Sequence, residues 1–309
     1  DIRPSRGLGD VYKRQTHTGK TDLANALYTK FPSELISVDS VQIYKNFDIG
    51  SNKPSPEEIK KFPHHLIDIL EPNEDFSVGD FKKRSLEIIQ KADEDSKIPI
   101  FVGGTMMYFY SLFEGLADLP PRDDLIRAEL NCDLETFGLS SLFQRLEKID
   151  PEAALKIHHH DTQRILRALE VCIITNNKFS EIIKKTNKKN LLDHKILSFA
   201  IVPDNRAKYK NELKIRFETM LKRGLVDEVK SIIERFSKNI SALNAVGYKQ
   251  CLEFIDGNLS EEEFITKSVN ASYQLAKRQI TWLNKLSTTR IFEKDEMNKV
   301  IKIESFLQI

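Results

Sequence analysis

The chain has 309 residues, about twice the usual size of one domain, so one large α/β domain with an appendage, or two domains, is expected. Apolar residues make up 40% and charged residues 30%, a balance typical of globular rather than disordered or fibrous proteins. The 47 lysines and arginines nearly equal the 46 aspartates and glutamates, so any basic surface for nucleic acid has to be local.

The sequence offers no candidate membrane span. The longest uncharged stretch, 98–113, is interrupted by a proline and two glycines and is too short to cross a bilayer as one helix. No apolar signal segment follows the amino terminus, and Cys132, Cys172 and Cys251 form neither a metal-binding pair nor a disulfide framework. We therefore expect a cytoplasmic protein that has no membrane partner.

The first part of the chain predicts alternating helices and strands. Apolar residues at helical spacing indicate a helix over 21–31, and a short β-type run over 35–38 ends at Asp39. A second amphipathic helix over 77–92 leads into a buried strand over 98–102, which ends in Gly-Gly-Thr. This alternation predicts an α/β fold with a parallel sheet flanked by helices.

The remaining chain predicts an inserted domain. From two prolines at 120–121 the pattern is helical only, until a strand-like run over 196–202 resumes the α/β theme ahead of carboxy-terminal helices. The basic stretch at 184–190 predicts a solvated loop or an arm that contacts phosphate. The arginines, proline and glycines before position 16 suit a mobile tail. We expect a non-native or disordered amino terminus over 1–15, an α/β core over 16–120 and 196–309, and an all-helical insertion over 121–195.

Gly19-Lys20-Thr21 opens the first predicted helix and matches the second half of a P-loop, the motif of nucleotide- and ATP-binding proteins. Backbone N–H groups would hold phosphates, Lys20 would contact phosphate oxygens, and Thr21 would ligate Mg²⁺. Arg14 stands where the first glycine of the motif belongs, and no apolar strand precedes it. A helix start that happens to contain these three residues is the competing interpretation.

Two polar residues follow predicted strand ends, where α/β sheets present reactive groups. Asp39 could accept a proton or hold a metal, although a turn or N-cap aspartate is an open alternative. Thr105 follows a glycine pair that lets the backbone approach a ligand closely. Because this second strand end carries no carboxylate, the pattern counts against an ordinary ATPase.

The predicted insertion contains a pair of arginines on one helix. Asp161 predicts the N-cap of a helix that runs to about Thr175, on which Arg164 and Arg167 lie one turn apart. Such a pair suits phosphate or base contacts, or forms an exposed face. The run at 158–160 consists of three histidines, whose side chains we expect to point in different directions and not to bind a metal.

Ser260 and Glu263 predict a capping box at the start of a long helix. One side of this helix is polar and basic, which suits a nucleic-acid backbone or a solvated face. The residues of this side are Gln274, Lys277, Arg278, Thr281, Trp282 and Lys285. Arg216 lies on another predicted helix, over 211–223.

Seven segments in order resemble the bacterial tRNA dimethylallyltransferases, also called tRNA isopentenyltransferases, from about Thr16 to Leu286. They are Thr16-x-x-Gly19-Lys-Thr21, Asp39-Ser-Val-Gln-Ile-Tyr44, Val102-Gly-Gly-Thr105-x-x-Tyr108, Asp150-Pro-x-Ala-Ala154, Ile157-His158 with Asp161-x-Gln163-Arg164-x-x-Arg167-Ala-Leu-Glu-Val171, Val246-Gly-Tyr-Lys249 and Ala276-Lys-Arg-Gln-Ile-Thr-Trp282.

The resemblance implies transfer of a dimethylallyl group from dimethylallyl diphosphate to the exocyclic amine of the adenosine immediately 3′ of the anticodon in tRNA, with Mg²⁺ assisting. It implies that a P-loop NTPase-like core performs the chemistry and that the inserted helical domain binds the anticodon stem-loop.

The resemblance also implies roles for single residues. Asp39 would accept the proton of the adenine amine, while Thr105 and Arg127 would position the base and stabilise the transition state. The implied diphosphate-binding residues are Thr16, His17, Thr18, Gly19, Lys20, Thr21 and Arg216, with Thr21 as the metal ligand. The implied tRNA-binding residues are Asp39, Ser40, Val41, Gln42, Thr105, Arg127, Gln163, Arg164, Ile165, Leu166, Arg167, Asn244, Val246, Gly247, Tyr248, Lys249, Lys277, Arg278 and Gln279.

The chain departs from the family pattern at a few positions. Arg14 and Gln15 replace a Gly-Pro pair, Ser272 replaces a usual threonine, and Asn284 stands where arginine is common.

Two other functions stay open. A P-loop small-molecule kinase would use Gly19-Lys-Thr21 and Asp39 but would leave the basic pairs unexplained. A noncatalytic RNA-binding protein would need the basic faces but not Asp39. We expect a monomer.

Overall fold

A computed structural model describes residues 19–185, 196–203, 205–283 and 289–293. The predicted tail over 1–15, the diphosphate-binding candidates Thr16, His17 and Thr18, and Asn284 and Lys285 lie outside these residues. Internal contacts divide the chain into two compact units, 1–109 with 194–309 and 110–193. The sequence had suggested limits at 121 and 195 for the insertion. None of the helices in the described part of the chain is long and apolar enough to cross a membrane.

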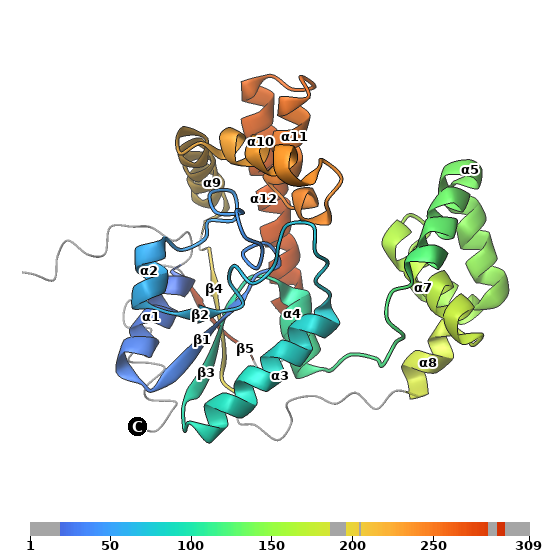
Figure 1. Ribbon diagram of the computed structural model, residues 1–309, viewed down its shortest axis with the longest axis horizontal. Coiled ribbons are helices and arrows are strands. Elements are labelled where there is room, and N and C mark those ends of the chain that lie inside the picture. The colour runs from blue at the N-terminus through green and yellow to red at the C-terminus, as the bar shows by residue number, and fades with distance from the viewer. Residues whose placement is uncertain (1–18, 186–195, 204, 284–288, 294–309) are drawn as a thin grey trace, which may run out of the picture. The chain divides into compact units, whose positions relative to one another are not determined.

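The centre of the first unit is a parallel sheet of three strands (Figure 1). Strand β1 (Ser33–Val38) lies between β2 (His64–His65) and β3 (Ile98–Gly103). The register pairs Val38 with Gly103, so β1 and β3 end at the same edge. Helices α1 (Lys20–Lys30) and α3 (Val78–Glu94) contact these strands. The predicted parallel sheet with flanking helices is therefore confirmed.

A second parallel pair joins β4 (Ser198–Val202) to β5 (Thr289–Glu293). The strand predicted over 196–202 thus begins two residues later, at Ser198. Strand β5 was not predicted from the sequence.

Helix starts follow the capping rules that the sequence suggested. The Ser260 hydroxyl accepts a hydrogen bond from Glu263 N at 3.3 Å, and Glu263 Oε2 accepts one from Ser260 N at 2.8 Å. This reciprocal pair opens α12 (Glu261–Leu283). Ser55 opens α2 (Pro56–Lys61) in the same way, and Ser77 opens α3 with Asp80 as its partner.

Carboxy-terminal helices build the main core of the first unit together with the segment after β1. Ile43 and Phe47 of that segment are buried in this core beside Phe217 and Phe264. In Figure 1 the blue chain after β1 runs to the orange helices. The helical elements concerned are α9 (Arg206–Lys222), α10 (Leu225–Phe236), the 3₁₀ turn η1 (Ser241–Asn244), α11 (Tyr248–Ile255) and α12.

The described residues of the second unit form helices joined by loops and no strand, in agreement with the predicted helical pattern. Helix α4 (Met106–Phe113) spans the point at which the first unit ends. The helices that follow are α5 (Asp124–Ile149), α6 (Pro151–Lys156), α7 (Thr162–Thr175) and α8 (Phe179–Lys185). Their shared core contains Leu130, Leu146, Ile165 and Leu169. Gly138 has φ of +76° and kinks α5, a conformation that glycine adopts without strain.

Candidate active site

The amino terminus of α1 lies at the edge where β1 and β3 end. Gly19 precedes this helix with φ of +74°, and no side chain caps the helix among the described residues. The amino terminus of α1, whose dipole favours negative charge, thus lies at this edge as in a phosphate-binding helix. Lys20 Nζ donates to Gly103 O at 3.1 Å, which fixes the ammonium group beside the end of β3.

Asp39 follows β1 directly and folds back over the next residues. Its Oδ1 accepts hydrogen bonds from Val41 N at 2.8 Å and Gln42 N at 3.2 Å. The turn aspartate that the sequence left open is therefore present. Because both bonds go to Oδ1, Oδ2 is the oxygen that can accept a proton from a ligand. The turn and a catalytic role are compatible.

Thr105 ties the ends of β1 and β3 together. Its Oγ1 accepts a hydrogen bond from Ser40 N at 3.1 Å, and the N–H groups of Gly104 and Thr105 both donate to Val38 O at 3.1 Å. A Cβ at Gly103 would lie 2.1 Å from that same carbonyl oxygen, so the position requires glycine. The glycine pair therefore allows a close approach of two strand ends.

Lys20, Asp39 and Arg216 are close enough to influence one another's charge. Burial lowers the pKa of Lys20; the carboxylate of Asp39 opposes this shift and Arg216 adds to it. Burial also lowers the pKa of Arg216, and Tyr209 and Asp39 oppose that shift. The charges of Lys20 on α1 and Arg216 on α9 thus both act together with that of Asp39, a combination that suits an anionic ligand and a proton acceptor.

Helix α12 reaches the same edge through Gln279, whose Nε2 donates to Gly104 O at 2.7 Å. Its neighbours Lys277 and Arg278 are exposed, so they are available to a phosphate backbone. Gln274 and Thr281 are exposed too, as the predicted polar side requires.

The segment 244–249 contains further residues that the resemblance assigns to tRNA, and their exposure to solvent differs. Asn244 and Lys249 are exposed, Val246 is half-buried and Gly247 is buried. The ring of Tyr248 is fully buried, at 0% exposure. Its place in the core suits a supporting role.

Arg127 lies in the second unit, where a buried carboxylate holds it. Its Nη2 donates to Glu170 Oε2 at 2.5 Å, and Arg167 Nη1 donates to the same oxygen at 2.9 Å. Arg167 also donates to Pro120 O at 2.6 Å. Burial alone would raise the pKa of Glu170, but the bonds from Arg167 and from Asp123 N–H, with the charge of Arg127, hold it below its ordinary value.

Helix α7 carries the remaining implied tRNA contacts. Gln163 and Arg164 are exposed, and Arg164 Nε lies 3.2 Å from Asp161 Oδ2. Ile165 and Leu166 are only 0% and 6% exposed, because they belong to the helical core. Their side chains therefore stabilise the helical core, and a tRNA contact at these two positions stays a prediction. Asp161 caps α7 as predicted, accepting from Arg164 N at 3.1 Å.

The three consecutive histidines do not diverge, contrary to the sequence-based expectation. The ring centroids of His158 and His159 lie 4.4 Å apart in a stacked arrangement, and those of His159 and His160 lie 4.0 Å apart. The turn before α7 gathers the rings at the surface. Within the described residues, no group of three or more histidines, cysteines or carboxylates is placed to hold a metal ion.

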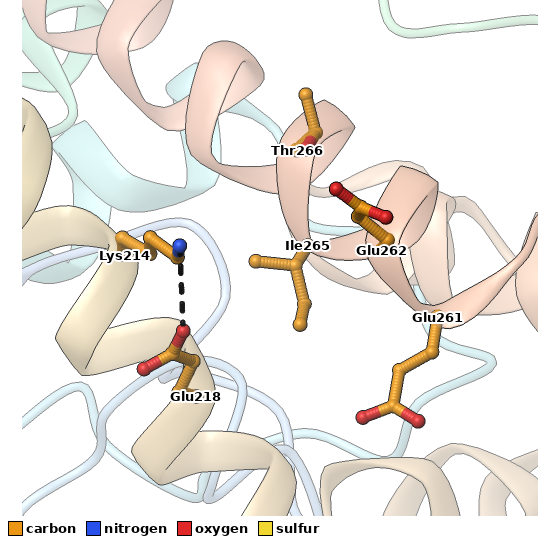
Figure 2. A pocket seen from close by; sticks show the side chains of 6 residues that line it. All are labelled: Lys214, Glu218, Glu261, Glu262, Ile265 and Thr266. Atoms are coloured by element: carbon orange, nitrogen blue, oxygen red, sulfur yellow. Dashed lines mark ion pairs between the residues drawn. The ribbon is translucent and has the colours of Figure 1, made fainter.

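A hollow of about 460 Å³ between α9 and α12 is unsuited to an anionic substrate. Figure 2 shows that carboxylates surround it and that its one cation, Lys214, points to Glu218 at 3.9 Å. Its other lining residues are Glu261, Glu262, Ile265 and Thr266. The strand edge with Lys20, Asp39 and Arg216 is therefore the stronger candidate.

Sequence reasoning missed the network that supports the segment after Asp39. The ammonium group of Lys53 is buried and lies 2.7 Å from Asp48 Oδ1 and 2.5 Å from Asp68 Oδ1. Glu228, on the distant helix α10, binds the backbone of the same loop. No local sequence signal connects residues that lie so far apart in the chain.

A parallel α/β sheet whose edge carries Lys20 and Asp39 suits an enzyme that transfers a group from an anionic donor. The chain belongs to the IPP transferase family, which it matches over residues 42–286.

A tRNA dimethylallyltransferase of Francisella philomiragia is 42% identical over 287 residues, which cover 92% of this chain and 93% of the relative. The crystal structure of the full-length tRNA isopentenylpyrophosphate transferase of Bacillus halodurans has a TM-score of 0.67 and 32% identity, covering 95% of this chain and 93% of that one. A eukaryotic dimethylallyltransferase acting on tRNA has a TM-score of 0.78 and 25% identity, covering 95% of this chain and 77% of that one.

Proposed function

We propose that this protein transfers a dimethylallyl group from dimethylallyl diphosphate to the exocyclic amine of the adenosine immediately 3′ of the anticodon in tRNA. The observation that carries the proposal is the position of Lys20 and Asp39 at the ends of β3 and β1, where the charge of Arg216 also acts on Lys20. The family and the names of its relatives support the choice of substrates.

In the proposed reaction the adenine amine nitrogen attacks C1 of the dimethylallyl group. The C1–O bond breaks and its electron pair leaves with the diphosphate, while Asp39 takes a proton from the amine. Lys20 and Arg216 stabilise the negative charge that develops on the leaving group. Thr105 positions the attacked base through its contact with Ser40, and stabilisation of the transition state by Arg127 stays part of the proposal on the strength of the family alone.

The diphosphate binds at the amino terminus of α1, where Gly19, Lys20 and Thr21 present backbone N–H groups. Mg²⁺ fits this site, because the ion needs only one or two hard oxygen ligands from a protein when phosphate oxygens supply the others. Thr21 would hold the ion through its hydroxyl, and the bound ion would neutralise charge on the diphosphate.

The tRNA contacts of the proposal come mainly from exposed polar residues of both units. Because the adenine has to leave its stack at a cost of a few kcal/mol, contacts to the extruded base and its neighbours are needed. Backbone and side-chain groups of Ser40 and Val41 are assigned to the base. The phosphate and flanking contacts are assigned to Gln163, Arg164, Asn244, Lys249, Lys277, Arg278 and Gln279. We further propose that the protein acts as a monomer in the cytoplasm, where unmodified tRNA is found.

Incubation with labelled dimethylallyl diphosphate and an unmodified tRNA tests the function. We expect label in the tRNA whose adenosine follows the anticodon and none in a tRNA with guanosine at that position. ATP with the same tRNA serves as the control, because a kinase would transfer phosphate instead. Tight tRNA binding without transfer of label would favour a noncatalytic RNA-binding protein and contradict the proposal.

A further inference from the structure

One carboxylate on α10 binds the loop at 48–50 from outside the sheet. Glu228 Oε2 accepts hydrogen bonds from Asp48 N at 3.1 Å and Ile49 N at 2.6 Å, and Oε1 accepts one from Gly50 N at 3.1 Å. No lysine or arginine of the described residues forms an ion pair with it. Consecutive backbone N–H groups therefore balance the charge of this side chain, and the carboxylate fixes the loop backbone in return.

Tyr248 completes the same contact. Its hydroxyl donates to Glu228 Oε1 at 2.8 Å and accepts from Ser51 N at 3.0 Å. The ring lies 4.7 Å from that of Phe47, measured between centroids, and a Cβ on Gly50 would come within 2.5 Å of it. Burial, and then the charge of Glu228, raise the pKa of Tyr248, which keeps the hydroxyl a donor at neutral pH.

Gln42 connects this loop to the candidate catalytic residue. Its side-chain Nε2 donates to Ser51 O at 3.2 Å and Asn52 O at 3.4 Å, while its backbone N donates to Asp39 Oδ1 at 3.2 Å. The Ser37 hydroxyl donates to Gln42 Oε1 at 3.2 Å. Hydrogen bonds thus run without a break from Glu228 and Tyr248, through the loop and Gln42, to the carboxylate of Asp39.

We propose that Glu228 and Tyr248 form a positioning pair for the reaction: they hold the loop at 48–52, and through Gln42 they fix the orientation of Asp39 toward the adenine amine. The inference rests on the proposed function, since it gives Asp39 the role of proton acceptor. Neither Glu228 nor Tyr248 touches the reacting atoms in this scheme. Their contribution is to the geometry of the transition state and not to substrate affinity.

The variant Tyr248→Phe tests the pair with the smallest change. It removes the hydroxyl, with its bonds to Glu228 and Ser51, and keeps the ring against Phe47. A misplacement of about 1 Å at a reacting group costs up to ~100-fold, so we expect the rate at saturating substrates to fall about 10–100-fold. The Kd for tRNA and the KM for dimethylallyl diphosphate should change less than about twofold.

A matched control separates positioning from general loss of stability. The control variant is Ile232→Val. Ile232 lies on the same helix as Glu228, is 1% exposed and belongs to the core that contains Tyr248. The substitution removes one buried methyl group, and the expected loss of stability is close to that of a lost hydrogen bond. We expect this variant to keep the wild-type rate. An equal loss in Ile232→Val and Tyr248→Phe would overturn the proposal.

A double-mutant cycle with Glu228→Gln tests whether the two residues act together. If both act through one loop, the double variant loses about as much rate as the worse single variant, because coupled residues are not additive. Losses that multiply, a change in KM alone, or an unchanged rate in Tyr248→Phe would overturn the pair. Tyr248→Phe is decisive by itself if Glu228→Gln does not fold. An inactive wild-type protein would instead overturn the proposed function.

Discussion

The Thr105 hydroxyl accepts a hydrogen bond from the backbone N–H of Ser40 at 3.1 Å and lies 3.4 Å from the Ser40 hydroxyl. This contact joins the turn after β1 to the turn after β3. Because Asp39 immediately precedes Ser40, the contact also restrains the carboxylate that we propose as proton acceptor.

The first prediction concerns this contact. Thr105→Val keeps the size of the side chain but removes the acceptor for Ser40 N–H, so the rate of dimethylallyl transfer should fall about 10–100-fold. Thr105→Ser keeps the hydroxyl and should retain most of the rate. Single-turnover kinetics with saturating tRNA and dimethylallyl diphosphate would measure both variants. Equal rates in the valine and serine variants would remove the hydroxyl from the mechanism.

The second prediction concerns Asp39 itself. Asp39→Asn can still accept the backbone N–H bonds of Val41 and Gln42, but it cannot take a proton from the adenine amine. We expect transfer to slow by about 10²–10⁴-fold, the range for loss of a general base. Affinity for tRNA, measured by filter binding, should stay within about twofold of the wild-type value. An Asp39→Asn protein as fast as the wild type would assign proton transfer to another group.

Local sequence signals predicted the strand ends and the helix caps well. Asp161 and Ser260 cap their helices as expected, since capping depends on residues within one turn. The sheet edge with Asp39 and Thr105 was also predictable, because parallel strands end at a common edge. The helix caps and the strand ends could therefore be predicted because each depends on a short stretch of sequence.

Long-range contacts could not be predicted in the same way. The Ser51 N–H donates to the Tyr248 hydroxyl across 197 positions of the chain. Glu228 binds backbone N–H groups of the loop, which almost every residue type provides, so the sequence does not indicate this contact. Likewise, the burial of Tyr248 could not be predicted from the family segment that we had assigned to tRNA as a whole. The packing of the folded chain is needed to distinguish a residue that stabilises the core from one that is exposed to tRNA.

The third prediction concerns the exposed basic residues of α12. Lys277→Ala and Arg278→Ala should each weaken tRNA binding and flatten the dependence of log affinity on log salt concentration by about 0.7–0.9. Lys60→Ala is the control, because Lys60 is an exposed cation on α2, apart from the proposed contacts. Binding titrations from low to moderate salt would measure the slopes. Wild-type slopes in both α12 variants would make this side a solvated face.

The last prediction concerns Glu170 and the pH dependence of stability. Its carboxylate is fully buried and holds Arg127 and Arg167, whose side chains are 18% and 29% exposed. Glu170→Gln should cost about 3 kcal/mol of unfolding free energy at neutral pH, the lower end for a broken buried ion pair, because both arginines keep some water contact. The isosteric variant Glu147→Gln, at an exposed position of α5, should have little effect.

The direction of the pH dependence follows from the lowered pKa of Glu170. A carboxyl group whose pKa is lower in the folded protein than in the unfolded chain stabilises the fold above the unfolded value and loses that effect as the pH falls through the folded value. The difference in Tm between wild type and Glu170→Gln should therefore be constant from neutral pH down to the ordinary value of 4.5 and shrink below it. Thermal unfolding followed by circular dichroism across this range provides the measurement. A Tm difference that grew as the pH fell would mean that the buried carboxyl is protonated in the folded protein, and that the arginines are not held by its charge.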